Sequence, residues 1–335
     1  MRIAIVGSYG HVGTMLNSLA ARRQDSLVGV APWGEDDPLS YLGSHPAAPE
    51  GTPRYESAEQ LLAEVDADVV GVFTPLYRLC ETSRMAIDAG AHVISEKPLA
   101  IELEDLHRLQ STAEEAGRRV TALFTMRAEP AFLAARSAVE EGLIGRPILA
   151  MGQKSYPFNQ RDEYYKKRQT YGGSMLWQAI HALDFVRWCS GREYVRAAAM
   201  NANVAHPTHP GMEDSGGVLL EFDGGGHAVI GFDYLRPWPG GEDEDRPWGD
   251  DRLRLVGDAG AVEVNGGFRP PVLMTPQVVG ELPLPEHRDP VGATLDSIEA
   301  GEADGGLVTM ADSFRVTEVA LRARDAADRG EVVDL

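Results

Sequence analysis

A glycine-rich turn between an apolar run and an amphipathic stretch constrains the fold of this chain more than any other feature. Residues 3–6 read Ile-Ala-Ile-Val, a continuous apolar run that is typical of a strand buried on both faces of a sheet. Apolar side chains at helical spacing begin at residue 12. A strand, a glycine loop and a helix in this order place a helix N-terminus where it can hold a dinucleotide pyrophosphate. The loop residues are Gly7, Ser8, Tyr9, Gly10, His11, Val12 and Gly13.

The spacing of the three glycines is GxxGxxG rather than the usual GxGxxG, with Ser8 where the usual pattern has a glycine. On its own, the loop therefore also fits a tight turn that binds nothing. The strand before it and the helix after it favour nucleotide binding, because glycines let the backbone approach the phosphates.

Apolar runs alternate with amphipathic stretches along the first part of the chain. Ser57 and Gln60 form a capping box that opens one helix, and Gly90 and Gly117 follow the ends of two others. Such alternation predicts a parallel sheet with right-handed crossovers, and so an α/β Rossmann dinucleotide-binding domain over residues 1–125. We expect its strands at residues 3–6, 27–30, 69–73, 92–95 and 120–124.

The pattern changes after Thr125 to strands separated by turn residues, which suits antiparallel meanders. We expect a second, α+β domain over residues 126–335, with a surface loop at 240–245. Its helices are expected at residues 130–141, 174–190, 291–300 and 310–328. Its strands are expected at 148–155, 195–204, 218–222, 228–232, 253–256 and 261–264.

The end of the second expected strand bears on which nucleotide is bound. An acid that holds the adenosine ribose is usual there, but this chain has Pro32 and Trp33. Glu35, Asp36 and Asp37 follow and are candidates for that role, although three acids also suit a solvated loop. No Arg or Lys lies nearby in the sequence to meet a 2′-phosphate, which favours NAD over NADP.

The charge balance excludes several classes of partner. The chain has 51 acidic and 31 basic residues, a formal charge of −20, which argues against nucleic acid and against an anionic membrane surface. No apolar run approaches the roughly 20 residues of a membrane span. The two cysteines, Cys80 and Cys189, have neither disulfide-scaffold nor zinc spacing, so we expect a cytoplasmic protein.

Several segments together resemble one known family. They are Thr74-Pro75, residues 92–98 (His-Val-Ile-Ser-Glu-Lys-Pro), Arg127, Pro130 and residues 142–147 (Gly-Leu-Ile-Gly-Arg-Pro). In order and spacing they resemble the glucose–fructose oxidoreductase/inositol dehydrogenase/MocA (Gfo/Idh/MocA) family, and Glu-Lys-Pro is the most specific element. The resemblance implies a Rossmann domain, a second domain built on a large, open, mostly antiparallel sheet, a nicotinamide cofactor in the cleft, and dimers or tetramers formed through that sheet.

Lys97 is the first catalytic candidate. It leaves a strand of the parallel sheet at its carboxyl end, where ligands bind in such folds. Hydride transfer from an alcohol needs a group that handles the hydroxyl proton, and the resemblance implies that Lys97 is catalytic and contacts the nicotinamide ribose and the substrate oxygen. Glu96 either pairs with Lys97 or orients the loop. Thr74, Pro75 and Glu96 join the glycine loop as expected cofactor-binding residues.

The expected helix over residues 174–190 carries the second half of the site. Trp177, His181 and Asp184 are spaced to share one helix face, and Gln178 lies beside it. The family pattern there is Asp-x-x-x-His-x-x-Asp, so Trp177 replaces an acid. His181 is the best acid–base candidate because its ordinary pKa is about 6.5. Trp177 is either a stacking platform for a sugar ring or core packing.

The remaining substrate-binding candidates are Arg127, Tyr156 and Tyr164. The two tyrosines belong to a basic and aromatic segment that suits hydroxyls, an anionic substrate group, or a loop that covers the sheet. His206 and His209, with Glu213 and Asp214, lack the spacing of a firm metal site, so no metal is expected.

The sequence favours an NAD(P)-dependent dehydrogenase that acts on a secondary alcohol of a sugar, polyol or related cyclic compound, with NAD preferred and NADP left open as the cofactor. One alternative is a glycoside-cleaving enzyme that uses NAD through transient oxidation. The other is a non-catalytic, dinucleotide-binding regulatory protein, which the missing acid at Trp177 favours.

Overall fold

The computed structural model describes residues 1–237 and 250–335. The expected loop at 240–245 lies outside the described residues. The chain divides into two compact units. Unit 1 contains Met1–Phe124 and Asp289–Thr317, and unit 2 contains Thr125–Arg288 and Glu318–Leu335.

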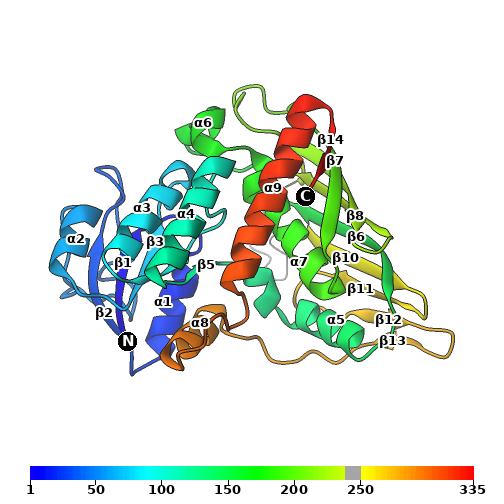
Figure 1. The fold of residues 1–335 in the computed structure, drawn as a ribbon, viewed down its shortest axis with the longest axis horizontal. Helices are drawn as coiled ribbons and strands as arrows, with labels where there is room; N and C mark the ends of the chain where they lie inside the picture. Colours follow the sequence, from blue (N-terminus) through cyan, green and yellow to red (C-terminus); the bar gives the residue numbers. More distant parts are fainter. Residues whose placement is uncertain (238–249) are drawn as a thin grey trace. The chain divides into compact units, whose positions relative to one another are not determined.

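Unit 1 is a parallel sheet of five strands in the order β2-β1-β3-β4-β5, counted in the described part of the chain. The order reverses at β1, which is where ligands bind in doubly wound sheets. The expected Rossmann fold is therefore confirmed (Figure 1). The strands are β1 (Arg2–Gly7), β2 (Ser26–Ala31), β3 (Val69–Phe73), β4 (His92–Ser95) and β5 (Val120–Ala122). The helices between them are α1 (Val12–Ala21), α2 (Ala58–Glu64), α3 (Leu76–Asp88) and α4 (Leu103–Ala116).

Local sequence signals account for these elements. All five residues of β3 are buried, as expected for a strand covered on both faces. The Ser57 hydroxyl accepts a hydrogen bond from the Gln60 amide at 3.2 Å and caps α2. Gly117 adopts a left-handed conformation with φ of 61° and ends α4.

The expected division after residue 125 is wrong in one respect, because Asp289–Thr317 returns to unit 1. Helix α8 (Pro290–Glu299) places Val291 and Leu295 in the same hydrophobic core as Ile3 and Ile5 of β1. The Ser18 hydroxyl of α1 donates to the Asp289 carboxylate at 2.6 Å. The helical pattern of this segment shows that one face is buried, but it does not show which core buries it.

Unit 2 is built on a nine-stranded mixed sheet, counted over its described residues. Its order is β13-β12-β11-β10-β6-β9-β8-β7-β14. All neighbours are antiparallel except β6 and β9, so the expected mostly antiparallel sheet is confirmed. The strands are β6 (Pro147–Ser155), β7 (Tyr194–Ala202), β8 (Ser215–Phe222), β9 (His227–Asp233), β10 (Asp250–Gly257), β11 (Ala261–Asn265), β12 (Val272–Met274), β13 (Val279–Glu281) and β14 (Val332–Asp334).

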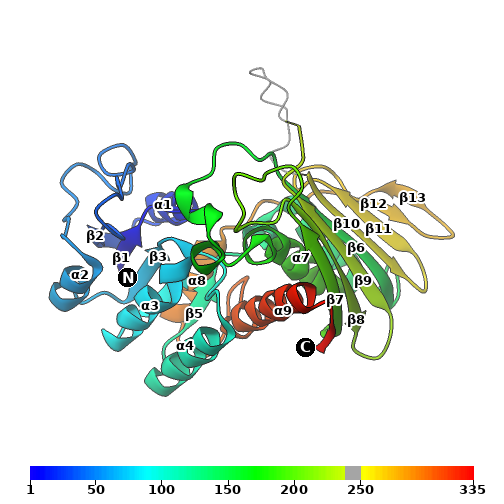
Figure 2. The ribbon, with the colours of Figure 1, turned by 90° about the horizontal axis from the view of Figure 1, so that it is seen from above.

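Helices α5 (Pro130–Glu140) and α7 (Ile180–Ser190) pack on this sheet, and Figure 2 shows α7 against one face of it. The expected helix over 174–190 is in two parts, since a π-helical turn (Met175–Ala179) precedes α7. Helix α9 (Met310–Arg329) starts in unit 1 and ends in unit 2. Short turns complete unit 2 at Thr125–Ala128, Glu163–Lys166 and α6 (Arg168–Tyr171).

Candidate active site

The glycine loop joins the end of β1 to the start of α1. Gly7 and Gly10 have φ of 88° and 59°, a region that favours glycine. The Tyr9 amide donates to the Phe73 carbonyl at 2.8 Å, which places the loop beside the end of β3. No side-chain bond caps α1 at His11, and the first amides of an α-helix have no partner within it. The loop therefore has the geometry that holds an anion at a helix N-terminus.

Gly10 has a second reason to be glycine, which the sequence did not indicate. A Cβ atom there would lie 2.5 Å from Oε2 of Glu96. The loop thus packs directly on a buried carboxylate, as well as leaving its backbone open to a ligand.

Glu96 is completely buried beside that loop. Its carboxylate accepts a hydrogen bond from the His11 amide at 2.8 Å and lies 2.9 Å from Nδ1 of the His11 ring. Burial alone would raise the pKa of Glu96, but the charge and hydrogen bonds of His11, followed by the charge of Lys97, hold this pKa below its ordinary value. Glu96 is therefore ionised at neutral pH, and it orients the loop, one of the two roles expected for it.

Lys97 follows β4 and is only 1% exposed. Its Nζ lies 4.0 Å from Oε1 of Glu96, so the pairing expected as the other role of Glu96 is also present. An ammonium group is costly to bury unless a charge compensates it, and Glu96 supplies that charge. The Lys97–Pro98 peptide bond is cis.

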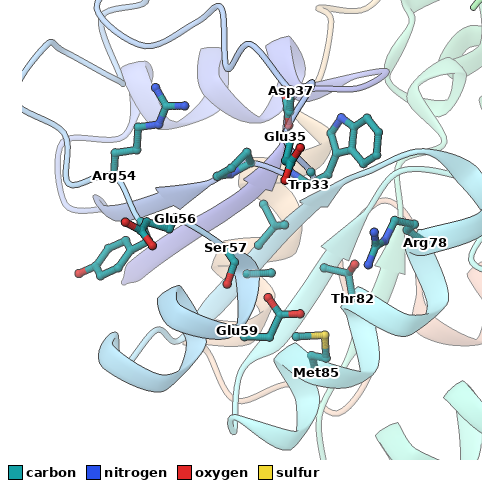
Figure 3. A pocket seen from close by; sticks show the side chains of 15 residues that line it. Trp33, Glu35, Asp37, Arg54, Glu56, Ser57, Glu59, Arg78, Thr82 and Met85 are labelled. Atoms are coloured by element: carbon teal, nitrogen blue, oxygen red, sulfur yellow. The ribbon is translucent and has the colours of Figure 1, made fainter.

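A cavity of about 680 Å³ opens in unit 1 next to the end of β2 (Figure 3). Its lining includes Trp33 and Glu35 from the segment after β2. Trp33 makes an edge contact with Tyr9 of the glycine loop, with ring centroids 6.0 Å apart. The size and polar lining of the cavity, next to the glycine loop, fit the adenosine half of a dinucleotide.

The three acids after β2 have different positions. Asp37 is buried and accepts hydrogen bonds from the Ser8 hydroxyl and, at 3.1 Å, from the Trp33 amide. Asp37 thereby fastens the glycine loop to this segment. Asp36 is exposed and does not line the cavity, whereas Glu35 and Asp37 both do. Because Asp37 already accepts hydrogen bonds from Ser8 and Trp33, Glu35 is the stronger candidate to meet a ribose.

Arg54 and Arg78 also line this cavity, and sequence reasoning missed both. Figure 3 shows them with Glu56 and Glu59 around the opening. No Arg lies close in the sequence to the end of β2, but the fold brings Arg54 and Arg78 to the cavity there. The segment of Arg54 reaches the site because Arg54 pairs with Val30 of β2 as an isolated bridge. Nothing in the local pattern signals that pairing.

In unit 2, the candidates Arg127 and Asp184 bind one another. The Arg127 Nη2 group donates to Asp184 Oδ1 at 2.6 Å and its Nε to Oδ2 at 3.0 Å, with both side chains 1% exposed. Such a two-pronged pair holds the turn at Thr125–Ala128 against α7. Both are expected to bind substrate, and that expectation stays a prediction; what the pair shows is that the two side chains fasten α7 to this turn.

His181 lies in the first turn of α7 and is 1% exposed. The π-helical turn before it departs from the α-helical spacing that placed Trp177, His181 and Asp184 on one face. Between residues 171 and 186, Trp177 alone is not buried. Gln178 is buried and donates to the Asp233 carbonyl at 2.5 Å. Trp177 is therefore the side chain of this turn that a ligand can reach.

The basic and aromatic segment before that turn forms a packed cluster. Tyr164 and Tyr165 have ring centroids 4.4 Å apart, and Tyr165 meets the edge of Trp177 at 6.4 Å. The ring centroids of Tyr156 and Tyr234 are 6.0 Å apart, and Tyr234 was not among the candidates from the sequence. We call Tyr156, Tyr164, Tyr165, Tyr171, Trp177 and Tyr234 the aromatic cluster. It brings together three of the expected substrate-binding residues.

The His and acid residues near 206–214 are engaged in other contacts. The Asp214 carboxylate accepts from the Val204 amide at 2.7 Å, and His206 stacks on Phe158 at 3.8 Å. Over residues 1–237 and 250–335, no group of three or more His, Cys, Asp or Glu side chains is arranged to hold a metal ion. Nor does any helix in these ranges have the length and apolar character to cross a membrane.

Comparison with known proteins gives two family matches. Residues 1–124 match the model described as an oxidoreductase family with an NAD-binding Rossmann fold. Residues 132–263 match the GFO/IDH/MocA C-terminal domain. Together the two models cover most of the chain.

Individual relatives agree with these matches. A solved structure of a candidate oxidoreductase from Thermotoga maritima is 30% identical, with a TM-score of 0.92 over 100% of both chains. An Agrobacterium radiobacter oxidoreductase, solved with NAD+, L-tartaric acid and magnesium, shares the fold at 18% identity and a TM-score of 0.80, over 100% of this chain and 98% of that one. The 1,5-anhydro-D-fructose reductase of Ensifer adhaerens is 34% identical over 49% of this chain and 50% of its own length. The chain matches about half the length of its curated relatives.

Proposed function

Because the chain belongs to the GFO/IDH/MocA family of oxidoreductases, whose N-terminal domain is an NAD-binding Rossmann fold, we propose that it is an NAD-dependent dehydrogenase. It moves a hydride between the cofactor and a secondary alcohol of a sugar, polyol or related cyclic compound. The similarity to 1,5-anhydro-D-fructose reductase supports this substrate class.

The buried pair of Glu96 and Lys97 is the observation that carries this proposal. An ammonium group at the carboxyl end of β4 lies at the edge of the sheet where ligands bind. The Glu96 carboxylate lies 4.0 Å from the Lys97 ammonium group and also holds the loop that would bind the pyrophosphate. A lysine that is buried and linked to a cofactor-binding loop is more typical of a catalytic residue than of a lysine that only makes the surface polar.

The reaction sets the roles that we propose for Lys97 and His181. Oxidation of an alcohol releases a hydride from carbon and a proton from oxygen, and bound NAD supplies the acceptor for the hydride. Lys97 contacts the substrate oxygen and stabilises the charge that develops there. His181 exchanges the hydroxyl proton as the general acid–base group.

We assign the cofactor to the glycine loop and its neighbours. Gly7 to Gly13 hold the pyrophosphate with the N-terminus of α1, and Glu35 meets the adenosine ribose in the cavity of Figure 3. Thr74 and Pro75, which separate β3 from α3, complete the site beside the loop. On the substrate side, we assign Tyr156, Tyr164, Trp177 and Gln178, with Trp177 as a platform for an apolar sugar face.

We further propose that the protein is a homodimer or homotetramer. The face of the unit 2 sheet carries exposed apolar side chains on four neighbouring strands: Met151 on β6, Val229 on β9, Leu219 on β8 and Met200 on β7. A contiguous apolar surface of this kind is typical of an interface, here with a second copy of the chain. The free thiols of Cys80 and Cys189 suit a reducing cytoplasm.

One experiment tests the function directly. The protein is incubated with NAD and a panel of sugars and polyols, and both NADH and the organic product are measured. A dehydrogenase forms NADH and an oxidised product in equal amounts. Product without net NADH would instead indicate glycoside cleavage. If neither product nor NADH forms, the chain is a non-catalytic binding protein.

A further inference from the structure

We propose that Arg161 recognises an anionic substituent, a carboxylate or a phosphate, on the substrate. The inference rests on the proposed function, because it concerns the substrate that the aromatic cluster would bind. It narrows the substrate class from sugars and polyols in general to sugar acids or sugar phosphates.

The charge of Arg161 is not compensated by any carboxylate that the structure describes. Within residues 1–237 and 250–335, no ion pair forms at this guanidinium. Its Nη2 group donates to the Pro157 carbonyl at 3.2 Å, and its Nε is buried without a hydrogen-bond partner in the same ranges. In a chain with a net charge of −20, such an arginine is conspicuous.

Neighbouring cations differ from Arg161 in this respect. Lys154 Nζ lies 2.5 Å from Asp251 Oδ1, and Lys166 Nζ lies 2.6 Å from Glu163 Oε1. The Arg168 guanidinium forms ion pairs with Glu213 and Asp328. Those contacts neutralise their charges locally. Lys167 of the same segment is exposed to solvent, which screens its charge, whereas Arg161 is a partly buried cation for which the described residues provide no carboxylate.

The aromatic cluster holds the Arg161 guanidinium in place. Its Cζ lies 4.6 Å from the ring centroid of Tyr234 and 5.6 Å from that of Tyr165. Stacking on aromatic faces fixes the plane of a guanidinium without consuming its hydrogen-bond donors. The planar fork then matches the two oxygens of a carboxylate or phosphate.

The position of Arg161 links it to the substrate side of the site. Tyr165, one of the rings under the guanidinium, also contacts Trp177. Tyr234, the other ring, lies beside Tyr156 and hydrogen-bonds to the Tyr171 hydroxyl at 3.1 Å. Arg161 is only partly buried, so a ligand can reach it. A sugar stacked on Trp177 would thus lie in the same cluster as a fixed, uncompensated cation.

The test compares a neutral sugar with two anionic derivatives that keep the same ring. Calorimetry of the NAD-loaded protein measures the affinities of D-glucose, D-glucuronate and D-glucose 6-phosphate. We expect at least one anion to bind about tenfold to hundredfold more tightly than D-glucose, the factor typical of a charge-assisted hydrogen bond. The preferred anion distinguishes a carboxylate from a phosphate. Higher salt should weaken the binding of the anion and leave that of D-glucose unchanged.

Variants then assign the preference to Arg161. Arg161→Gln should abolish the anion preference and leave D-glucose affinity within about twofold, and Arg161→Lys, which keeps the charge but loses the fork, should retain part of it. Lys167→Gln removes an exposed charge from the same segment and should change nothing. Circular dichroism and NAD affinity show that each variant is folded.

Two results would overturn the inference, and they separate it from the proposed function. If the neutral sugar binds as tightly as both anions, or if Arg161→Gln keeps the preference, Arg161 has no such role, while turnover of neutral sugars would leave the dehydrogenase assignment intact. If none of the panel sugars or their anions binds or reacts although NAD binds, both proposals fail.

Discussion

Glu96 connects the glycine loop and Lys97 through one side chain. Its carboxylate bonds to the His11 amide, contacts the His11 ring and compensates the charge of Lys97. It also occupies the space that a side chain at Gly10 would need. A change at this position therefore affects the loop and the lysine together, whereas changes at Lys97 can be separated from the loop.

Lys97→Met should lower the rate of alcohol oxidation by about 10² to 10³-fold, the range typical of losing one group that stabilises charge developing on oxygen. Methionine keeps much of the apolar stem, so the fold and NAD binding should persist. Steady-state kinetics and calorimetry measure the two effects. Lys167→Met, at an exposed position, is the matched control. A Lys97→Met enzyme with wild-type turnover would exclude Lys97 from the chemistry.

Glu96→Gln tests the buried carboxylate through the pH dependence of stability. The folded pKa of Glu96 lies below its ordinary value, so its stabilisation is complete above about pH 4.3 and is lost as the pH falls through the folded pKa. Melting temperatures of the wild type should therefore drop more steeply below pH 5 than those of Glu96→Gln, and the variant should be less stable at pH 7. Glu115→Gln, an exposed change, should follow the wild type. Parallel curves for wild type and Glu96→Gln would contradict this account.

At the scale of elements, α7 is fastened by the Arg127–Asp184 pair and preceded by a π-helical turn. The pair is buried, so its energetic contribution lies in the cost of breaking it rather than in its net attraction. A π-helical turn is common next to functional sites, and here it presents Trp177 while its neighbours stay buried.

Arg127→Met should destabilise the protein by about 3–5 kcal/mol, because it leaves the Asp184 charge buried and uncompensated. The double variant Arg127→Met/Asp184→Leu removes both charges and should recover much of that loss. Urea unfolding measures each value. Arg108→Gln, which breaks an exposed pair with Glu104, should cost less than about 1 kcal/mol. Equal losses in the single and double variants would show that packing, not charge, fastens α7.

Elements whose signals are local could be predicted from the sequence. Strands β3 and β4 have the expected bounds because unbroken apolar runs define them, and α4 ends before Gly117 as expected. Strands β12, β13 and β14 have three residues each, too few for a periodic pattern, and they were missed. Lys97 could be predicted because it directly follows a strand that the sequence shows. Arg54 could not, because it reaches the cavity only through its pairing with Val30, a residue distant in the sequence.

At the scale of the whole molecule, the exposed apolar face of the unit 2 sheet is the feature that bears on assembly. Leu219 is 52% exposed and Met200 83% exposed, which is unfavourable in water over a large area. The proposed self-association would cover this face and leave the helix-covered face of the sheet unchanged.

Light scattering should therefore find a dimer or tetramer for the wild type. Leu219→Glu places a charge on that face and should shift the mass toward the monomer at micromolar concentration. Tyr77→Glu alters an exposed residue on α3 of unit 1 and should leave the assembly intact. A monomeric wild type would refute the proposed interface.

The return of Asp289–Thr317 to unit 1 has a consequence for how the chain is made. Ribosomes release a protein from its N-terminus, and N-terminal domains usually fold first during synthesis. Here the core around Ile3 and Ile5 lacks Val291 and Leu295 until the whole of residues 125–288 has been translated. The first unit to emerge is thus among the last to be completed, and a nascent chain arrested before residue 289 would expose the apolar surface of α1 that α8 later covers.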